Sequence, residues 1–311
     1  MRVIGLKDLP LDIAASSVTV GSFDGFHRGH LSIIRELSVI SRCVVTPTVL
    51  VTFRIPPRIV LSGDENSLLM TAEEKIEVAE KAGLDYLLLL DFTEELREMG
   101  AREFLERILL EGLKAKRIVL GFNHHFGRNR EGDIHFLANH VEEMGFGLTV
   151  VPPEKIGDMV VNSSRIRKFL WDGEVERASE CLGRPYSLSG KVVKGLGLGE
   201  KIGFRTANLE PDRLKLVPRD GVYAVSIGLG SSSYGGVMNI GRRPTVDGHS
   251  RMLEVHIFGY EGRLYGKRIK VEFIKRLRGE RKFGDLNALR EQIERDIETA
   301  RNVLASKGFP G

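Results

Sequence analysis

The sequence predicts an α/β protein with a doubly wound parallel sheet, followed by a small antiparallel β-barrel that ends in a C-terminal helix. In the first part of the chain, short apolar runs alternate with helical stretches. This pattern requires right-handed crossovers and a parallel sheet that is covered on both faces. After Gly183 the helical pattern gives way to short β-rich runs with glycine turns, at the spacing of a sandwich or barrel. We therefore expect two domains, 1–183 and 184–311, joined at Gly183-Arg184-Pro185.

The expected elements follow in order along the chain. Five apolar runs of the first domain are typical of buried strands: 18–23, 44–53, 86–92, 117–122 and 146–151. The best marked helix begins at Thr71, which has the spacing of a capping box with Glu74, and Gly83 lies where a C-terminal cap belongs. The barrel strands are expected at 187–193, 222–229, 234–240, 253–258 and 267–275. A closing helix, 285–306, has one apolar face and Asp285 as its N-cap.

Composition indicates an ordinary globular enzyme. The 311 residues are 42% hydrophobic and 28% charged, which is typical of a folded chain, and a net charge of +4 does not separate anionic substrates from nucleic acid. The chain has no run of about 18 apolar residues, so no membrane span is expected. Two cysteines give no disulfide framework, which agrees with a reducing compartment. We therefore expect a cytoplasmic protein.

The most informative stretch is the loop 21–30, which reads GSFDGFHRGH and lies between the first expected strand and an amphipathic helical segment. His27 and His30 are three residues apart. They can point at one anion over the N-terminal end of that helix, where unpaired backbone N–H groups favour negative charge. A plain surface turn is one alternative, and a zinc site is another. Zinc is disfavoured because the adjacent His124 and His125 rarely bind one ion together. The loop therefore predicts a nucleotide site.

Two further polar stretches follow expected strands, at the edge of a parallel sheet where ligands bind. One is 121–130, and the other is 161–167, which enters a helix. In the second stretch Ser163 or Ser164 can cap the helix, while Arg167, about one turn further, can reach a phosphate. A simple cap with a solvated arginine is the commoner explanation for this stretch alone. Beside the 21–30 loop, a phosphate site is favoured.

The barrel domain contains a glycine-rich stretch, 195–208. Repeated glycines allow the backbone to approach a ligand, and Thr206 and Asn208 would share one face of an extended strand, toward a cation or phosphate. A flexible hairpin is the alternative. Further along, Glu254 and His256 share the strand face opposite to the apolar residues around them. Whether that face lies inside or outside the barrel stays open, but a carboxylate near a hydroxyl would serve as a general base.

Together these motifs resemble the bacterial bifunctional riboflavin kinase/FAD synthetases, over nearly the whole chain and in the same order. The matching segments are 21–30, similar to GxFDGxHxGH; 162–167, similar to SSTxIR; 203–208, similar to GFPTAN; 236–245, similar to GVxNIGxRPT; and 264–267, which reads LYGK. The resemblance implies a nucleotidyltransferase-like FMN adenylyltransferase domain at 1–183 and a riboflavin kinase domain at 184–311.

The resemblance also implies roles for residues. In the barrel, the ribityl hydroxyl of riboflavin would attack the γ-phosphate of ATP, with Glu254 as base, Thr206 on Mg²⁺ and Asn208 ordering the nucleotide. The residues expected to bind ATP or flavin in the two domains are Gly21, Phe23, Asp24, Gly25, Asn123, Ser163, Ser164, Gly197, Gly203, Asn208 and Asn239. We expect riboflavin, FMN and FAD as substrates or products.

In the first domain the resemblance implies adenylyl transfer. The phosphate of FMN would attack the α-phosphate of a second ATP and expel pyrophosphate, while His27, His30 and Arg167 stabilise the charge on the phosphates. No protein nucleophile is needed, because the attacking phosphate is already anionic. Asn123 is expected on the flavin phosphate or metal side of this site.

Three positions depart from the family pattern. Pro56 stands where the family often has a histidine, which removes a phosphate contact and puts the rate of adenylylation in doubt. Ser164 replaces a threonine but keeps the hydroxyl. Arg205 replaces a proline before Thr206, which loosens the backbone and leaves the threonine hydroxyl available, so kinase activity should survive.

Two other classes of function stay open at the level of sequence. The chain could be a single-activity nucleotidyltransferase whose barrel is a regulatory module, or a flavin- or RNA-binding protein, since small barrels bind single strands through aromatic residues and a basic groove. The barrel half has many basic residues but no clear row of aromatic ones. We expect small-molecule substrates, and no nucleic acid, membrane or obligate protein partner.

Overall fold

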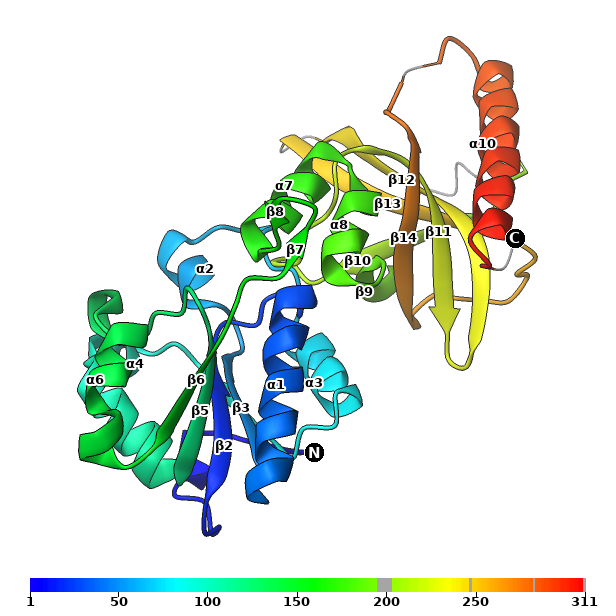
Figure 1. Ribbon diagram of the computed structural model, residues 1–311. Coiled ribbons are helices and arrows are strands. Elements are labelled where there is room, and N and C mark those ends of the chain that lie inside the picture. Colours follow the sequence, from blue (N-terminus) through cyan, green and yellow to red (C-terminus); the bar gives the residue numbers. More distant parts are fainter. Residues whose placement is uncertain (195–202, 246–247, 282, 310–311) are drawn as a thin grey trace. The chain divides into compact units, whose positions relative to one another are not determined.

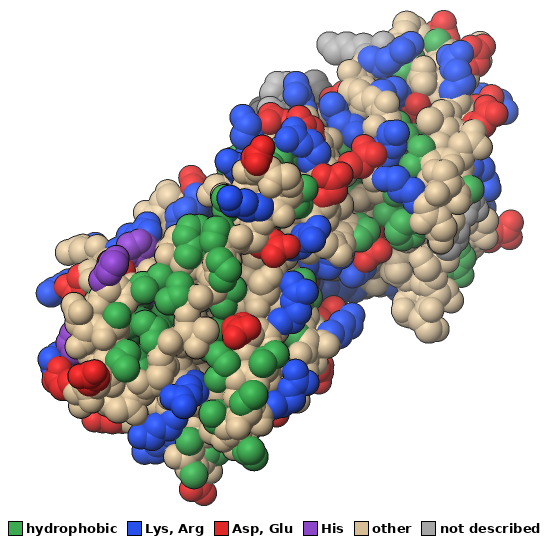
Figure 2. Space-filling view, viewed as in Figure 1, with side chains coloured by type: hydrophobic (Ala, Val, Ile, Leu, Met, Phe, Trp, Pro, Cys, Tyr) green, Lys and Arg blue, Asp and Glu red, His purple; other side chains and the backbone are tan. Residues whose placement is uncertain are grey.

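The computed structural model describes residues 1–194, 203–245, 248–281 and 283–309 (Figure 1). It confirms the predicted parallel α/β sheet followed by an antiparallel barrel and a C-terminal helix. The chain forms two compact units, Met1–Ser163 and Ser164–Gly311. On the face shown in Figure 2, hydrophobic side chains gather over the first unit. No helix among the described residues is long and apolar enough to cross a membrane.

The first unit is built on a six-stranded parallel sheet in the order β1-β4-β3-β2-β5-β6. Its strands are β1 (Arg2–Ile4), β2 (Ser16–Val20), β3 (Thr48–Phe53), β4 (Tyr86–Leu90), β5 (Ala115–Gly121) and β6 (Gly147–Val151). From β2 the chain adds β3 and β4 on one side, and then returns to add β5 and β6 on the other. The strand order therefore changes direction between β2 and β5, which is where parallel sheets of this type bind ligands.

Helices cover both faces of this sheet (Figure 1). They are α1 (Arg28–Val44), α2 (Pro57–Ser62), α3 (Ala72–Lys81), α4 (Glu94–Glu98), α5 (Ala101–Glu103), the π-helix η2 (Phe104–Gly112) and α6 (Ile134–Met144). One apolar cluster joins Val18 and Val49 to Phe104 of η2, and a second joins Leu50 to Leu37 of α1. Alternate residues of the strands thus face opposite layers, as a sheet that is buried on both sides requires.

The well-marked helix of the sequence is α3. Its N-cap is Thr71, whose hydroxyl accepts from the Glu74 N–H at 3.3 Å, while the Glu74 carboxylate accepts from the Thr71 N–H at 3.0 Å. The predicted capping box is therefore confirmed. Gly83 follows the C-cap residue Ala82 and has a φ of +75°, the left-handed conformation that favours glycine after a helix.

Two short 3-10 helices and a two-stranded hairpin complete the first unit. They are η1 (Leu6–Asp8), η3 (Arg128–Arg130) and a hairpin of β7 (Lys155–Ile156) and β8 (Met159–Val160). The hairpin leads into α7 (Ser163–Asp172), and α8 (Val175–Leu182) follows. The compact units divide at the start of α7, so both of these helices are grouped with the barrel. The functional boundary near Gly183 stays a prediction.

The second unit is a closed antiparallel barrel in the order β10-β13-β12-β11-β14-β9. Its strands are β9 (Tyr186–Val193), β10 (Ala207–Pro211), β11 (Gly221–Leu229), β12 (Ser232–Thr245), β13 (Gly248–Ile257) and β14 (Arg268–Arg278). The closing helix, α10 (Leu286–Ser306), begins at the predicted N-cap Asp285 and packs on β11, β12 and β14. Arg278 of β14 binds the Asp296 carboxylate through two nitrogens, Nε at 3.0 Å and Nη2 at 2.7 Å, and so attaches α10 to the barrel.

Candidate functional site

The 21–30 loop lies at the carboxyl end of β2, beside the point where the strand order changes direction. Its backbone is unusual, because Phe23 and Phe26 have φ angles of +43° and +40°, and Gly25 has a φ of +93°. Residues with side chains rarely adopt such angles, and the surrounding fold must hold them there. Both phenylalanine rings are buried, 1% and 0% exposed, and so provide that hold through packing.

The two histidines of the loop lie face to face. His27 is the N-cap of α1, and its Nδ1 accepts a hydrogen bond from the His30 N–H at 3.3 Å. The two rings stack with centroids 3.6 Å apart. Because Nδ1 of His27 acts as the acceptor, the ring proton belongs on Nε2, which can donate to an anion from a neutral imidazole. The structure therefore brings the two predicted histidines together at the start of a helix, where anions are favoured.

Asp24 attaches the same loop to the segment that precedes α3. Its carboxylate is buried and accepts hydrogen bonds from the N–H groups of Leu69 and Met70, each at 3.0 Å. These two residues directly precede the N-cap of α3. Ser163 adds a second tie, since its hydroxyl donates to the Asp24 carbonyl at 2.9 Å. A contact of Asp24 or Ser163 with ATP stays a prediction.

Lys75 of α3 was not found by sequence reasoning. Its side chain is completely buried, and its ammonium donates to the carbonyl oxygens of Ser22 at 3.0 Å and Phe53 at 2.6 Å. Burial lowers the pKa of Lys75 to about 8, and the charge of Asp24 opposes that shift. In the folded protein Lys75 lies on the buried face of α3 together with Ala72 and Ala79, and no pattern in the sequence sets it apart from an exposed helix lysine.

The loop after β5 starts beside the 21–30 loop, because β5 and β2 are neighbours in the sheet. Asn123 is exposed there. The ring of His124 stacks on Phe126 with centroids 5.8 Å apart. Burial, with smaller effects of His125 and Arg130, lowers the pKa of His124 to about 4, so this imidazole is neutral near pH 7. The loop thus offers flat, uncharged rings near the end of the sheet.

Three other predicted residues of the first site are placed as follows. Pro56 is the N-cap of α2 and makes no side-chain cap, so the position supplies no polar group. Ser164 and Arg167 lie on α7, which belongs to the second unit, and Arg167 is buried. Their contact with a phosphate in the first site stays a prediction.

The predicted barrel site lies on the outer face of the barrel. Glu254 of β13 pairs in register with Asn208 of β10 on one side and with Asn239 of β12 on the other. Residues that face each other across neighbouring strands share a face of the sheet, so these three side chains form one row. Leu253 and Val255, on either side of Glu254, are buried in the barrel interior. The face that carries Glu254 and His256, which the sequence could not place, therefore lies outside the barrel.

The chain before β10 runs along this row. Nδ1 of His256 lies 2.8 Å from the Arg205 carbonyl, and the Phe204 ring meets the His256 ring edge-on with centroids 5.8 Å apart. Thr206 and Gly203 are exposed in this segment, and Gly203 has a φ of +88°. Gly197, also predicted to bind ATP, lies outside the described residues.

A second carboxylate, Glu280, lies close to the row and was not predicted. It follows β14 in the sequence, yet a Cβ added to Gly241 would collide with its carboxylate oxygen. The Asn239 amide lies on the same side of Gly241. A side chain at position 241 would therefore require the exposed Glu280 side chain to move.

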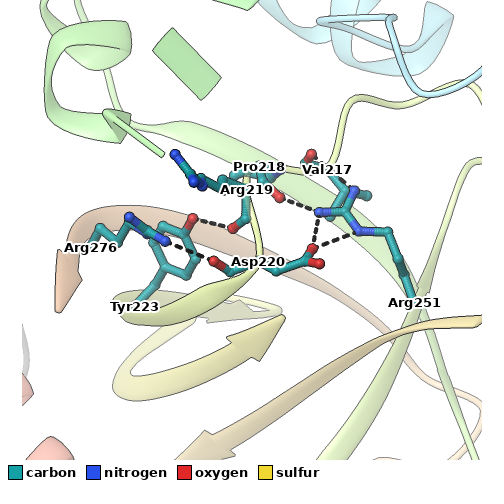
Figure 3. A network of polar contacts seen from close by, with 7 residues as sticks. All are labelled: Val217, Pro218, Arg219, Asp220, Tyr223, Arg251 and Arg276. Atoms are coloured by element: carbon teal, nitrogen blue, oxygen red, sulfur yellow. Dashed lines mark hydrogen bonds and ion pairs between the residues drawn. The ribbon is translucent and has the colours of Figure 1, made fainter. Parts of the chain in front are cut away.

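A polar network fixes the strand that carries Glu254 (Figure 3). Arg251, three residues earlier in β13, binds the Asp220 carboxylate at 2.6 Å and the Pro218 carbonyl at 2.5 Å. Arg276 donates to the Asp220 carbonyl at 2.8 Å, and the Tyr223 hydroxyl donates to the Arg219 carbonyl. Burial raises the pKa of Tyr223 to about 12, so its hydroxyl stays a donor.

Comparison with known proteins gives a family match for each half of the chain. The FAD synthetase family profile matches residues 11–165, and the riboflavin kinase profile matches residues 182–304. The chain is 34% identical to the bifunctional riboflavin kinase/FMN adenylyltransferase of Pseudomonas fluorescens over 97% of each chain. It is 37% identical to the enzyme of the same name from Escherichia coli K12 over 92% of each. The chain belongs to the bifunctional riboflavin kinase/FMN adenylyltransferase family.

One solved structure is also similar over nearly the whole chain. It is the crystal structure of a protein named Macrolide-efflux Protein from Streptococcus pneumoniae, 31% identical, with a TM-score of 0.88 over 97% of this chain and 99% of that one. The FAD synthetase domain contains the 21–30 loop and Lys75, and the riboflavin kinase domain contains the row around Glu254. Residues 166–181, most of α7 and α8, lie between the two matched segments.

Among the residues that the structure describes, no group of three or more His, Cys, Asp and Glu side chains could hold a metal ion. The row of Asn208, Glu254 and Asn239 instead offers amide oxygens and a single carboxylate, and Thr206 in the preceding segment offers a hydroxyl. Hard oxygen donors of this kind suit Mg²⁺, which is usually held by one or two protein groups together with phosphates.

Proposed function

We propose that this enzyme phosphorylates riboflavin to FMN in the barrel and then adenylylates FMN to FAD in the α/β unit, using ATP in both reactions. The observation that carries the proposal is the presence of two separate polar sites, each inside one of the matched family segments. The first gathers stacked histidines at a helix start, and the second aligns a carboxylate with two amides. The substrates in this proposal are all small molecules.

In the kinase reaction, Glu254 accepts the proton of the ribityl 5′-hydroxyl as that oxygen attacks the γ-phosphate of ATP. Asn208 and Asn239, on either side of Glu254, keep the carboxylate in a row of hydrogen-bonding groups that can orient the hydroxyl and the nucleotide. Thr206 would help to hold Mg²⁺, which neutralises charge on the phosphates of ATP when it is bound, and Asn208 would order the nucleotide.

In the adenylylation reaction, a phosphate oxygen of FMN attacks the α-phosphorus of ATP, and the bond to pyrophosphate breaks. The Nε2–H of His27 and the first N–H groups of α1 donate to the phosphate oxygens as negative charge builds on them. His30, stacked on His27, supplies a second imidazole at the same place. The loop after β5, with the neutral His124 and Phe126, would face the flavin ring.

Two variants test the proposal. We expect Glu254→Gln to reduce FMN formation from riboflavin by about 100-fold or more and to leave FAD formation from supplied FMN intact, because only one site loses its base. His30→Ala should do the reverse, by the loss of a charge-stabilising donor. Chromatography of flavins after incubation with ATP and Mg²⁺ measures both products.

The controls are Glu210→Gln, an exposed carboxylate on β10, and His135→Ala, an exposed histidine on α6. Both should keep the two activities. If one active-site variant removed both activities, the two reactions would share a site and the proposal would be wrong. Wild-type enzyme that made FAD from FMN but no FMN from riboflavin would instead be a single-activity nucleotidyltransferase.

A further inference from the structure

Lys75 is a charged side chain in the core of the first unit that the proposed reactions do not use. Its ammonium has two hydrogen-bond partners, the carbonyl oxygens of Ser22 and Phe53, and both are neutral. Burying an ammonium is unfavourable, and two carbonyl groups do not offset the lost hydration as a carboxylate in contact would. A methionine would fill the same space without that cost. The fold therefore keeps a charge here at the expense of its own stability.

The two carbonyls mark the ends of neighbouring strands. Phe53 is the last residue of β3, and Ser22 follows the end of β2 at Val20. Thr52 also donates to the Ser22 carbonyl, at 2.9 Å. With its carbonyl turned toward Lys75, the Ser22–Phe23 peptide must turn the Phe23 N–H to the opposite side, because a trans peptide holds the two groups antiparallel. Lys75 thus fixes the peptide at which the positive-φ part of the 21–30 loop begins.

We propose that Lys75 is a positioning residue for adenylyl transfer, which holds the 21–30 loop in its phosphate-binding conformation and keeps a positive charge behind the carboxyl ends of β2 and β3. The inference rests on the proposed function of this loop. A buried charge is screened less than a charge in water, so its field extends toward phosphates bound at the strand ends. Asp24, from the loop itself, is the charged group that acts on the ammonium.

The pH dependence of the reaction can distinguish this role of Lys75 from a purely structural one, because Lys75 loses its charge at high pH. The pKa of Lys75 is about 8 in the folded protein, and an unfolded lysine has a pKa of 10.5. Between these two values the unfolded chain binds more protons than the folded one, so stability rises with pH in this window. The proposed role requires the opposite trend for catalysis, because the neutral amine carries no charge toward the phosphates.

The experiment measures FAD formation from FMN, FMN formation from riboflavin, and urea unfolding for the wild type, Lys75→Met and Lys81→Met between pH 7.5 and 9.5. Lys81 is an exposed lysine at the end of the same helix and serves as the matched control. We expect Lys75→Met to lower the kcat of FAD formation by about 100-fold with a change in KM for FMN of less than about threefold. FMN formation should stay within about twofold of the wild-type rate.

The pH profile of the wild type gives the second readout. Its kcat for FAD formation should fall about 20-fold from pH 7.5 to 9.5 while its unfolding midpoint does not fall, and the Lys75→Met rate should be flat over this range. FAD formation by Lys75→Met within threefold of the wild type, or a wild-type rate that follows stability, would overturn the inference. Wild-type enzyme that makes no FAD would instead overturn the proposed function.

Discussion

Two buried threonines on neighbouring strands differ in whether the hydroxyl has a hydrogen-bond partner, and this difference affects stability. Thr19 of β2 and Thr52 of β3 are both 0% exposed. The Thr52 hydroxyl donates to the Ser22 carbonyl, whereas the Thr19 hydroxyl has no hydrogen-bond partner in the described part of the chain. A buried hydroxyl without a partner lowers the stability of the fold, whereas a buried hydroxyl that ties a loop to a strand raises it.

We expect Thr19→Val to raise the free energy of unfolding by about 1 kcal/mol, since valine has the same shape and removes the unpartnered oxygen. Thr52→Val, the matched control, should lower it by about 1 kcal/mol and also slow FAD formation, because it frees the Ser22 carbonyl. Urea unfolding curves at pH 7.5 measure both. A loss of stability in Thr19→Val would show that its hydroxyl is hydrogen-bonded in solution.

Site residues were predictable from sequence where side chains suited to the reaction lie close together in the chain. His27 and His30 lie in one loop between a strand and a helix, and their spacing alone placed them together. Lys75 was missed because a lysine on a helix is ordinarily exposed, and only the packing of α3 shows that this one is buried. Glu280 was missed because its approach to Gly241 depends on how β14 and β12 are arranged in the barrel.

Among the elements, α1 has atypical residues at both ends. It begins at a histidine N-cap, His27, and ends at Val45, whose φ of +53° and ψ of +56° are left-handed. A β-branched residue is strained in this conformation, which glycine adopts without cost. The Val45 side chain is 89% exposed and contributes little burial in return.

Replacing this cap should stabilise the first unit. We expect Val45→Gly to raise the free energy of unfolding by about 1 kcal/mol, because the strain of the left-handed valine is removed and little apolar contact is lost. Thermal unfolding followed by circular dichroism would detect the change. Val45→Thr keeps the branched Cβ and should give no gain, and a gain of the same size in Thr would trace the effect to polarity instead of backbone strain.

The elements themselves were largely predictable, because each long apolar run or amphipathic stretch carries its own periodicity. The missed strands are short: β1 has three residues, β7 and β8 have two each, and β10 has five and begins at the end of the glycine-rich stretch. The row of Asn208, Glu254 and Asn239 was beyond sequence reasoning for a different reason. Its register depends on pairing between strands far apart in the chain, which no local pattern encodes.

In the whole molecule, α7 and α8 are grouped with the barrel unit, although nearly all of their residues precede the segment that matches the riboflavin kinase family. α8 packs against β9 and β14, and Ala178, Cys181 and Leu182 of α8 are buried. The Arg219 N–H donates to the Leu170 carbonyl of α7 at 2.9 Å, and Lys307 pairs with Glu176 at 3.5 Å.

We therefore expect the kinase half to depend on these helices. A fragment of residues 164–311 should phosphorylate riboflavin at a rate near that of the full chain, whereas a fragment of 184–311 should unfold at lower urea concentration and lose activity on warming. The shorter fragment exposes the apolar residues that α8 covers on β9 and β14, and each buried aliphatic side chain contributes about 1.5–3 kcal/mol. Equal unfolding midpoints for the two fragments would contradict the packing argument.

The two large β-sheets of the molecule differ in a way that matters when the enzyme is stored at high concentration. The barrel is closed, so every strand in it is paired on both sides, whereas the parallel sheet ends in the edge strands β1 and β6. Val150 of β6 is 39% exposed, and Phe122, just past the end of the neighbouring β5, is 45% exposed. An unpaired strand edge beside exposed apolar side chains is a template for pairing with another chain. Aggregation should therefore begin at the FAD synthetase half, and riboflavin kinase activity should be the last to disappear from an ageing preparation.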